Sequence, residues 1–155
     1  KDILYLMSDV ATGTLLLKRE CFDKSRYFDE KLLRHQDLQV LVEFTSKYKL
    51  MQVDEYLHCV DVSDIQNRPN PEKLVKYKSD FFESIRDTMD TLSAKEKKWV
   101  YAMHRFELGY VYLKNKQPIM CLKNSLPILC HLKTVNMSIM KVINRIKTYK
   151  SHRAG

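Results

Sequence analysis

The sequence predicts an α/β fold of few strands in the first part of the chain and an all-α region after it. Two stretches indicate strands. Leu15 to Leu17 is a continuous apolar run that suits a buried strand, and residues 50–62 are β-like in composition. Between them, apolar residues recur from Leu38 at the spacing of one helix face. From Pro71 onwards the apolar spacing is helical throughout.

A Thr-Gly-Thr segment at residues 12–14 precedes the first predicted strand. Gly13 has no Cβ, so it either lets a ligand or another chain segment approach the backbone or only relieves crowding where the strand starts. Residues 19–25 are expected to form a short helix or turn. The amphipathic helix extends to about Tyr48 and places Asp37 in its first turn, where free N–H groups and the helix dipole favour an ionised carboxylate.

The clearest boundary in the chain lies at residues 63–71. Pro69 and Pro71 cannot donate backbone hydrogen bonds, and together they prevent regular pairing in this segment. We therefore predict two domains, residues 1–68 and residues 69–155.

Four helices are predicted in the second domain. Pro71 suits the first turn of the first helix. Ser93 and Glu96 match a capping box that starts the second helix, which ends near Asn115. Pro127 should kink or break the third helix. The predicted helical ranges are 71–92, 94–115, 119–132 and 134–149.

Length and composition limit the possible function classes. The chain has 155 residues, of which 45% are hydrophobic and 30% charged, and this composition indicates a globular protein. It contains no uncharged apolar run of about 18 residues, so no membrane-spanning helix is expected. Four widely spaced cysteines form no Cys-x-x-Cys pair and no Cys/His cluster. We therefore expect reduced, buried thiols, no zinc site and a cytoplasmic location.

The net charge of +8 is distributed unevenly. Residues 1–70 contain 10 Lys and Arg against 12 Asp and Glu, for a net charge of −2. Residues 71–155 contain 17 against 7, for a net charge of +10. Such asymmetry predicts different partners for the two parts. The basic part could meet an anionic membrane face, an anionic lipid-linked acceptor or nucleic acid.

An ordered set of short motifs occupies residues 8–62. Phe28-Asp29-Glu30 forms a polar turn, Gln36-Asp37 opens a helix, and Val53-Asp54-Glu55-Tyr56-Leu57 lies in the second predicted strand. Before them, the Thr-Gly-Thr segment leads into a strand that ends in the basic pair Lys18-Arg19. This order resembles the acceptor-binding half of inverting family 2 glycosyltransferases with the GT-A fold. The resemblance implies that the α/β part is the C-terminal portion of that nucleotide-diphospho-sugar transferase fold.

The resemblance also implies a reaction, the inverting transfer of a sugar from a nucleotide-diphosphate donor to an acceptor hydroxyl. Asp37 matches the aspartate that acts as the catalytic base, although an acid that only opens a helix is the alternative interpretation. The candidate substrate-binding residues are Arg34, His35, Gln36, Thr12 and Gly13. The first three would contact the acceptor, with Gln36 in place of the commoner Glu, and the last two would form the floor of the site.

The donor-binding half that the resemblance implies is not recognisable in this chain. Relatives hold Mn²⁺ or Mg²⁺ against the donor diphosphate with an Asp-x-Asp site, and no such site precedes Thr12. We therefore expect the metal ligands and the nucleotide-sugar site to precede Lys1, and this chain to be inactive alone. Relatives carry an Arg-x-His where this chain has His58-Cys59-Val60, so His58 either substitutes for that histidine or is a half-buried structural residue.

The expected acceptor is a glycan or a lipid-linked sugar. The expected setting is cell-surface polysaccharide synthesis, in the cytoplasm or at the inner face of the membrane. Residues 63–71 either close over the acceptor, as a loop often does in the resembled family, or form a plain linker.

A function of another class is a non-enzymatic helical interaction module, in which the basic part docks an acidic partner or a membrane surface. The last predicted helix carries Lys141 and Arg145 beside an apolar face, so it either lies on an anionic membrane or presents a solvated basic face. Nucleic acid is not favoured, because the helical spacing of Tyr101 and Tyr110 is better explained by packing than by base stacking.

Overall fold

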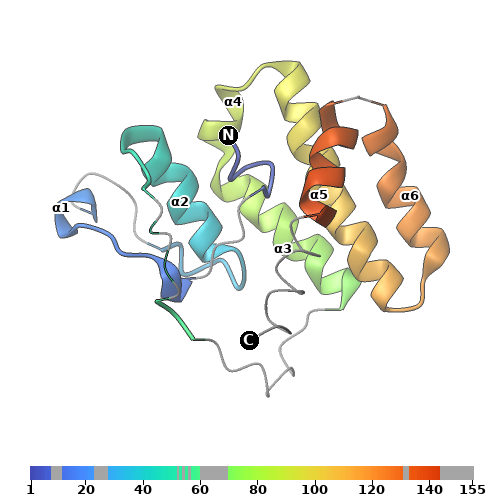
Figure 1. Cartoon of the computed structure of the whole chain (residues 1–155), viewed down its shortest axis with the longest axis horizontal. Helices are drawn as coiled ribbons and strands as arrows, with labels where there is room; N and C mark the ends of the chain where they lie inside the picture. Colours follow the sequence, from blue (N-terminus) through green and yellow to red (C-terminus); the bar gives the residue numbers. More distant parts are fainter. Residues whose placement is uncertain are drawn as a thin grey trace. The chain divides into compact units, whose positions relative to one another are not determined.

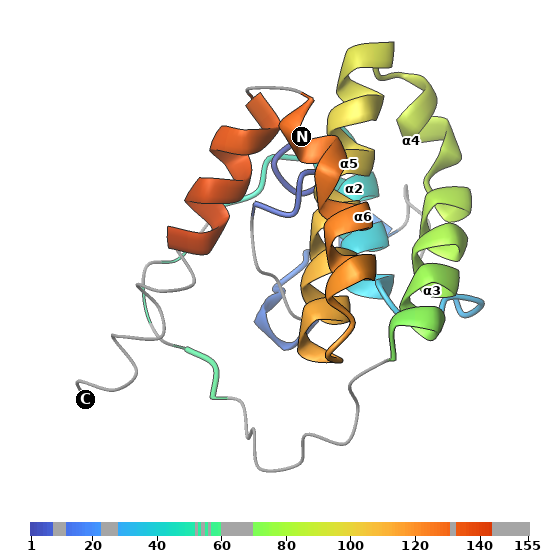
Figure 2. The same ribbon diagram turned by 90° about the vertical axis from the view of Figure 1, so that its right-hand side faces the viewer.

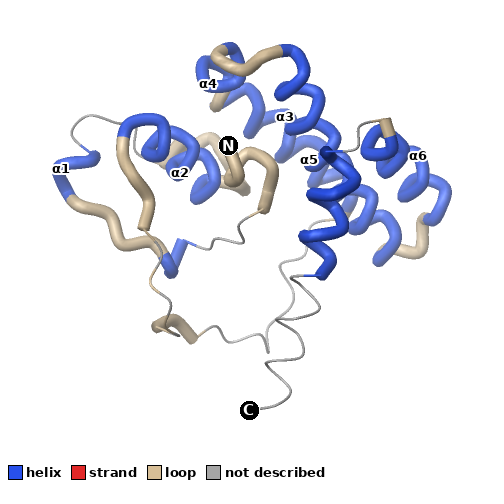
Figure 3. The backbone as a smooth tube through the Cα atoms, turned by 45° about the horizontal axis from the view of Figure 1, so that its top comes forward, coloured by secondary structure: helices blue, strands red, loops and turns tan. Residues whose placement is uncertain are grey.

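The computed structural model describes residues 1–7, 12–22, 28–51, 53, 55, 57–59, 70–130 and 133–143. All regular elements within these ranges are helices (Figure 3). The chain forms two compact units. We call residues 8–92 the central unit, and residues 1–7 together with 93–155 the hairpin unit. The predicted domains, 1–68 and 69–155, are a different division of the chain and stay a prediction.

The predicted α/β fold class is wrong for the described residues, because none of them lies in a strand. Leu15 to Leu17 are irregular, and the side chain of Leu16 is 100% exposed. The described positions between 50 and 59 are irregular as well, whereas the other residues of that predicted strand lie outside the described ranges. A strand requires a neighbour to complete its hydrogen-bond ladder, and a short apolar run does not provide one.

The described residues of the central unit contain five helical elements. They are η1 (Thr12–Thr14), α1 (Arg19–Phe22), α2 (Gln36–Lys47), α3 (Pro71–Ser84) and α4 (Arg86–Asp90), shown in Figure 1. The predicted amphipathic helix is confirmed by α2, whose apolar face is buried. Phe44 on this face packs edge-to-face against Phe22 of α1, with ring centroids 5.3 Å apart.

The helix predicted over residues 71–92 is divided at Ile85 into α3 and α4. Its start is as expected, since Pro71 occupies the first turn and the side chain of Asn70 accepts a hydrogen bond of 2.8 Å from Lys73 N. Near the break, Ser84 Oγ donates to the carbonyl of Phe81 at 2.8 Å. Such bonding of a serine to the preceding turn competes with the helical ladder and bends helices.

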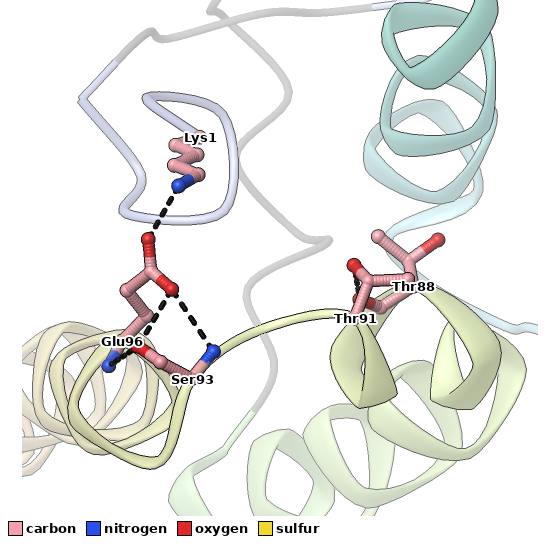
Figure 4. A network of polar contacts seen from close by, with 5 residues as sticks. All are labelled: Lys1, Thr88, Thr91, Ser93 and Glu96. Atoms are coloured by element: carbon pink, nitrogen blue, oxygen red, sulfur yellow. Dashed lines mark hydrogen bonds and ion pairs between the residues drawn. The ribbon is translucent and has the colours of Figure 1, made fainter.

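The hairpin unit is built on α5 (Ala94–Lys114) and α6 (Pro118–Leu129), which lie side by side in Figure 2. The predicted capping box is confirmed, because the Ser93 side chain accepts from Glu96 N at 3.3 Å and Glu96 Oε2 accepts from Ser93 N at 2.9 Å (Figure 4). Residues 133–143 are helical, and the rest of the fourth predicted helix lies outside the described residues.

Helices α5 and α6 approach closely at Gly109. A Cβ at position 109 would lie 2.6 Å from Ser125 Oγ and 3.2 Å from the carbonyl oxygen of Cys121. The absence of a side chain therefore sets the distance between the two helices. Pro127 lies inside α6, two residues before the helix ends at Leu129.

The N-terminal segment packs into the hairpin unit, and the side chains of residues 3–6 are buried. His104 Nε2 on α5 lies 3.1 Å from the carbonyl oxygen of Leu4. Lys141 Nζ donates to the carbonyl of Leu6. Lys141 was a candidate for an exposed basic face, yet its side chain is buried in this contact.

All four cysteines are free thiols. The prediction that they are buried is wrong, because Cys59 and Cys130 are exposed, whereas Cys21 and Cys121 are half-buried.

Candidate functional site

The candidate site begins with a polar turn before α2. Asp29 Oδ1 accepts a hydrogen bond of 3.0 Å from Lys31 N, and the carbonyl of Asp29 accepts one of 3.0 Å from Leu32 N. This is the side-chain-to-backbone bonding that makes aspartate common in turns. Asp29 therefore has a structural role in this turn, which leads into the buried Leu32.

Hydrogen bonds fasten this turn to the start of α2. Gln36 Nε2 donates to the carbonyls of Leu32 at 2.6 Å and Asp29 at 3.5 Å. Gln39 Oε1, one helical turn later, accepts from Asp29 N at 3.3 Å. The Phe-Asp-Glu turn and the Gln-Asp helix start thus form one loop–helix unit. Since Gln36 directs its N–H groups at main-chain carbonyls, a contact with a sugar would use its Oε1.

Gln39 is the residue of this unit that the sequence analysis missed. Its side chain is 1% exposed, and its Nε2 donates to Glu43 Oε1 at 2.8 Å while its Oε1 holds the turn. A polar residue on the apolar face of an amphipathic helix was the pattern that could have identified it, because a buried amide needs partners.

His35 adopts a left-handed backbone conformation at the N-cap of α2, with φ 66° and ψ 21°. This conformation is uncommon for a residue with a Cβ and is found in turns and at functional sites. The half-buried His35 ring packs edge-to-face against Phe81 of α3, with centroids 5.6 Å apart. Arg34 is exposed, so the two residues differ in their access to an acceptor.

Asp37 lies in the first turn of α2 and is half-buried. Its Oδ1 accepts a hydrogen bond of 2.8 Å from Leu38 N. The main chain thereby holds one carboxylate oxygen in the first turn of the helix. A carboxylate whose orientation is fixed by a main-chain donor is a suitable arrangement for a general base.

Thr12 and Gly13 are exposed residues of η1. A Cβ at position 13 would lie 2.6 Å from His58 Cε1 and 2.8 Å from His58 Nε2. Gly13 therefore allows the close approach of another chain segment, which is one of the two alternatives that the sequence left open. His58 itself is exposed and not half-buried. The structure thus brings residues 28–39 together in the loop–helix unit. It separately brings Gly13 close to His58.

No group of three or more His, Cys, Asp and Glu side chains among the described residues could hold a metal ion. The divalent cation expected from the resemblance, with ligands before Lys1, therefore stays a prediction, and no step of the chemistry below passes through it.

No helix within the described ranges is both long enough and apolar enough to cross a membrane. The chain matches no protein-family model, no curated protein and no solved structure.

Proposed function

We propose that this chain is part of an inverting glycosyltransferase and contributes the catalytic base and the acceptor contacts. The observation that carries the proposal is the loop–helix unit at residues 28–39. Two motifs of the glycosyltransferase resemblance are joined there by hydrogen bonds that Gln36 donates and one that Gln39 accepts, and Asp37 lies where the motifs meet.

In the proposed reaction, the ionised carboxylate of Asp37 takes the proton of an acceptor hydroxyl. The acceptor oxygen forms a bond to the anomeric carbon of the donor as the bond from that carbon to the diphosphate oxygen breaks. The electron pair of the broken bond leaves with the nucleoside diphosphate. Attack from the face opposite the leaving group inverts the anomeric configuration.

The remaining residues have positioning and binding roles in this proposal. Arg34 is exposed and can donate to acceptor hydroxyls, while His35 shapes the entry to α2. Gln36 presents Oε1 to the acceptor. Thr12 and Gly13 form the floor with His58 beside them. The donor and a divalent cation would be held by residues outside this chain.

The proposed acceptor is a glycan or a lipid-linked sugar, and the proposed pathway is cell-surface polysaccharide synthesis on the cytoplasmic side of the membrane. These assignments depend on the resemblance alone.

The proposal is tested by measuring nucleoside-diphosphate release by the full-length gene product from a panel of nucleotide sugars, with an acceptor mixture present. We expect release from one donor and its loss in Asp37→Asn, which keeps the shape of the side chain but removes its basicity. Asp87→Asn is the control, because Asp87 is also a first-turn aspartate in the central unit, although its side chain is exposed whereas that of Asp37 is half-buried.

Equal loss of release in both variants would indicate a general effect on folding and would contradict the assignment of Asp37. Failure of every donor to bind the full-length protein would contradict the glycosyltransferase itself.

A further inference from the structure

Helix α6 has one buried face and one exposed apolar face. Asn124 and Ile128 are buried on the side where Gly109 of α5 approaches it. The opposite side carries four large apolar residues at helical spacing, which we call the α6 stripe. These residues, with their exposed fractions, are Ile119 (80%), Leu122 (63%), Leu126 (50%) and Leu129 (71%).

The segment of chain that contains the α6 stripe carries charges of one sign. Residues 108–155 contain nine Lys and Arg and no Asp or Glu. Among the described ones, Lys114, Lys116, Lys123 and Lys133 are exposed, and they lie before, within and after α6. Lys123 falls beside Leu122 and three residues before Leu126, so it borders the stripe. Arg105 Nη2 donates to the carbonyl of Lys123 at 3.0 Å and adds a cation at the α6 backbone.

We propose that the α6 stripe is a docking surface for an anionic lipid membrane. An interfacial helix has an apolar face that enters the boundary between headgroups and acyl chains, with basic residues that contact anionic headgroups. Helix α6 has both features, and the acid-free sequence around it gives the required charge complementarity. Such a helix lies in the plane of the membrane and does not cross it.

The same charges disfavour a second copy of this chain as the occupant. A symmetric dimer through the α6 stripe would bring the lysines of both copies together, and like charges across an interface oppose association. A soluble acidic partner would satisfy the lysines, but it does not account for four exposed apolar side chains in a single row. An anionic membrane surface accounts for both the lysines and the row of exposed apolar side chains.

The surface is tested by flotation of the full 155-residue chain with two kinds of vesicle, one of phosphatidylcholine and one that also contains phosphatidylglycerol. We expect binding to the anionic vesicles only, and a decrease in binding as NaCl rises from about 50 to about 500 mM. The double variant Leu122→Ser/Leu126→Ser should bind the anionic vesicles at least about tenfold more weakly.

Matched controls separate the stripe from a general effect. Leu50→Ser/Val75→Ser removes two apolar side chains of similar exposure, 53% and 46%, from the central unit and should bind normally. Lys116→Glu/Lys123→Glu should weaken binding, whereas Lys73→Glu/Lys76→Glu changes the net charge equally on α3 and should weaken it less. Circular dichroism confirms that each variant is folded.

Several outcomes would overturn the proposal. They are absence of binding to the anionic vesicles, equal binding to both kinds of vesicle, and unchanged binding by the stripe variant. A dimer in light scattering that the stripe variant abolishes would assign the surface to a second copy. Binding to heparin as tight as to anionic vesicles, with both unaffected by the stripe variant, would show that the basic residues alone attract polyanions and that the α6 stripe is not a membrane-docking surface. None of these results depends on sugar transfer.

Discussion

At the scale of single residues, the orientation of Asp37 depends mainly on main-chain groups. The Leu38 N–H holds its Oδ1, and the turn before it is held through Asp29. The position of Asp37 in a first turn could be predicted from the apolar spacing after it. A glutamine on an otherwise apolar face indicates a buried amide that needs partners. That one of these partners is the Asp29 N–H, ten residues earlier in the chain, could not be predicted from the sequence.

Gln39→Met tests this positioning role. The variant keeps the volume of the side chain but leaves the Asp29 N–H without its acceptor, so we expect a loss of about 1–3 kcal/mol in unfolding free energy. Amide exchange at Asp29 should also accelerate, as measured by NMR. Leu41→Met is the control, since it alters the same buried face without a polar atom. Equal exchange at Asp29 in both variants would show that Gln39 does not hold the turn.

Glu96 gives a prediction for the pH dependence of stability. The hydrogen bond from Lys1 and those from Ser93 lower the pKa of Glu96 from 4.5 to about 2. Because the pKa is lower in the folded state than in the unfolded chain, this stabilisation is present above about pH 4.5 and is lost as the pH falls towards 2. The side chain lies at the surface, so salt should reduce the effect.

The measurement is the melting temperature between pH 2.5 and pH 6 at low salt. The wild type should lose more of its melting temperature on acidification than Glu96→Gln, which cannot ionise. Glu72→Gln, which alters the first turn of α3, is the control and should follow the wild type. Parallel curves for the wild type and Glu96→Gln would rule out the contribution of this carboxylate.

At the scale of elements, the predictions that depended on local chemistry were confirmed. The Ser93 capping box and the first-turn proline at residue 71 each act within a few residues of chain. The strand predictions failed because pairing is a property of two segments, and the run at Leu15 to Leu17 does not identify a partner. The division of the 71–92 helix at Ile85 was also not foreseen from its apolar spacing.

Gly109→Ala tests the contact between α5 and α6. In an exposed helix this change would stabilise by about 1 kcal/mol through helix propensity. Here the new methyl group meets Ser125 Oγ and the Cys121 carbonyl, so we expect a net loss of about 1–3 kcal/mol in a urea titration. The loss should be smaller in a Ser125→Ala background. Net stabilisation by Gly109→Ala would contradict the close approach.

At the scale of the whole molecule, the hairpin unit is closed by residues that are far apart in sequence. Residues 1–7 belong to the hairpin unit. The chain then forms the central unit and re-enters the hairpin unit at Ser93. Contacts from Lys1, His104 and Lys141 hold the segment in place. This arrangement could not be predicted from the sequence, where residues 3–6 appear only as a short apolar run and Lys141 as part of a basic face.

The two parts of the molecule carry different proposals, and this separation agrees with the charge asymmetry of the sequence. The central unit contains the loop–helix unit with Asp37, and the hairpin unit contains the α6 stripe. Substitutions in one unit should therefore leave the function of the other intact. The stripe variant should keep sugar transfer to a soluble acceptor, and Asp37→Asn should keep vesicle binding.

The central claim, that Asp37 is the base of a sugar transfer, is tested most directly by steady-state kinetics of Asp37→Asn in the full-length protein. We predict a fall in kcat of about 10²-fold or more, with the KM for the donor nearly unchanged, because the carboxylate acts on the acceptor proton only in the transition state. A variant that keeps the wild-type kcat would contradict the claim and leave Asp37 as a helix-start acid.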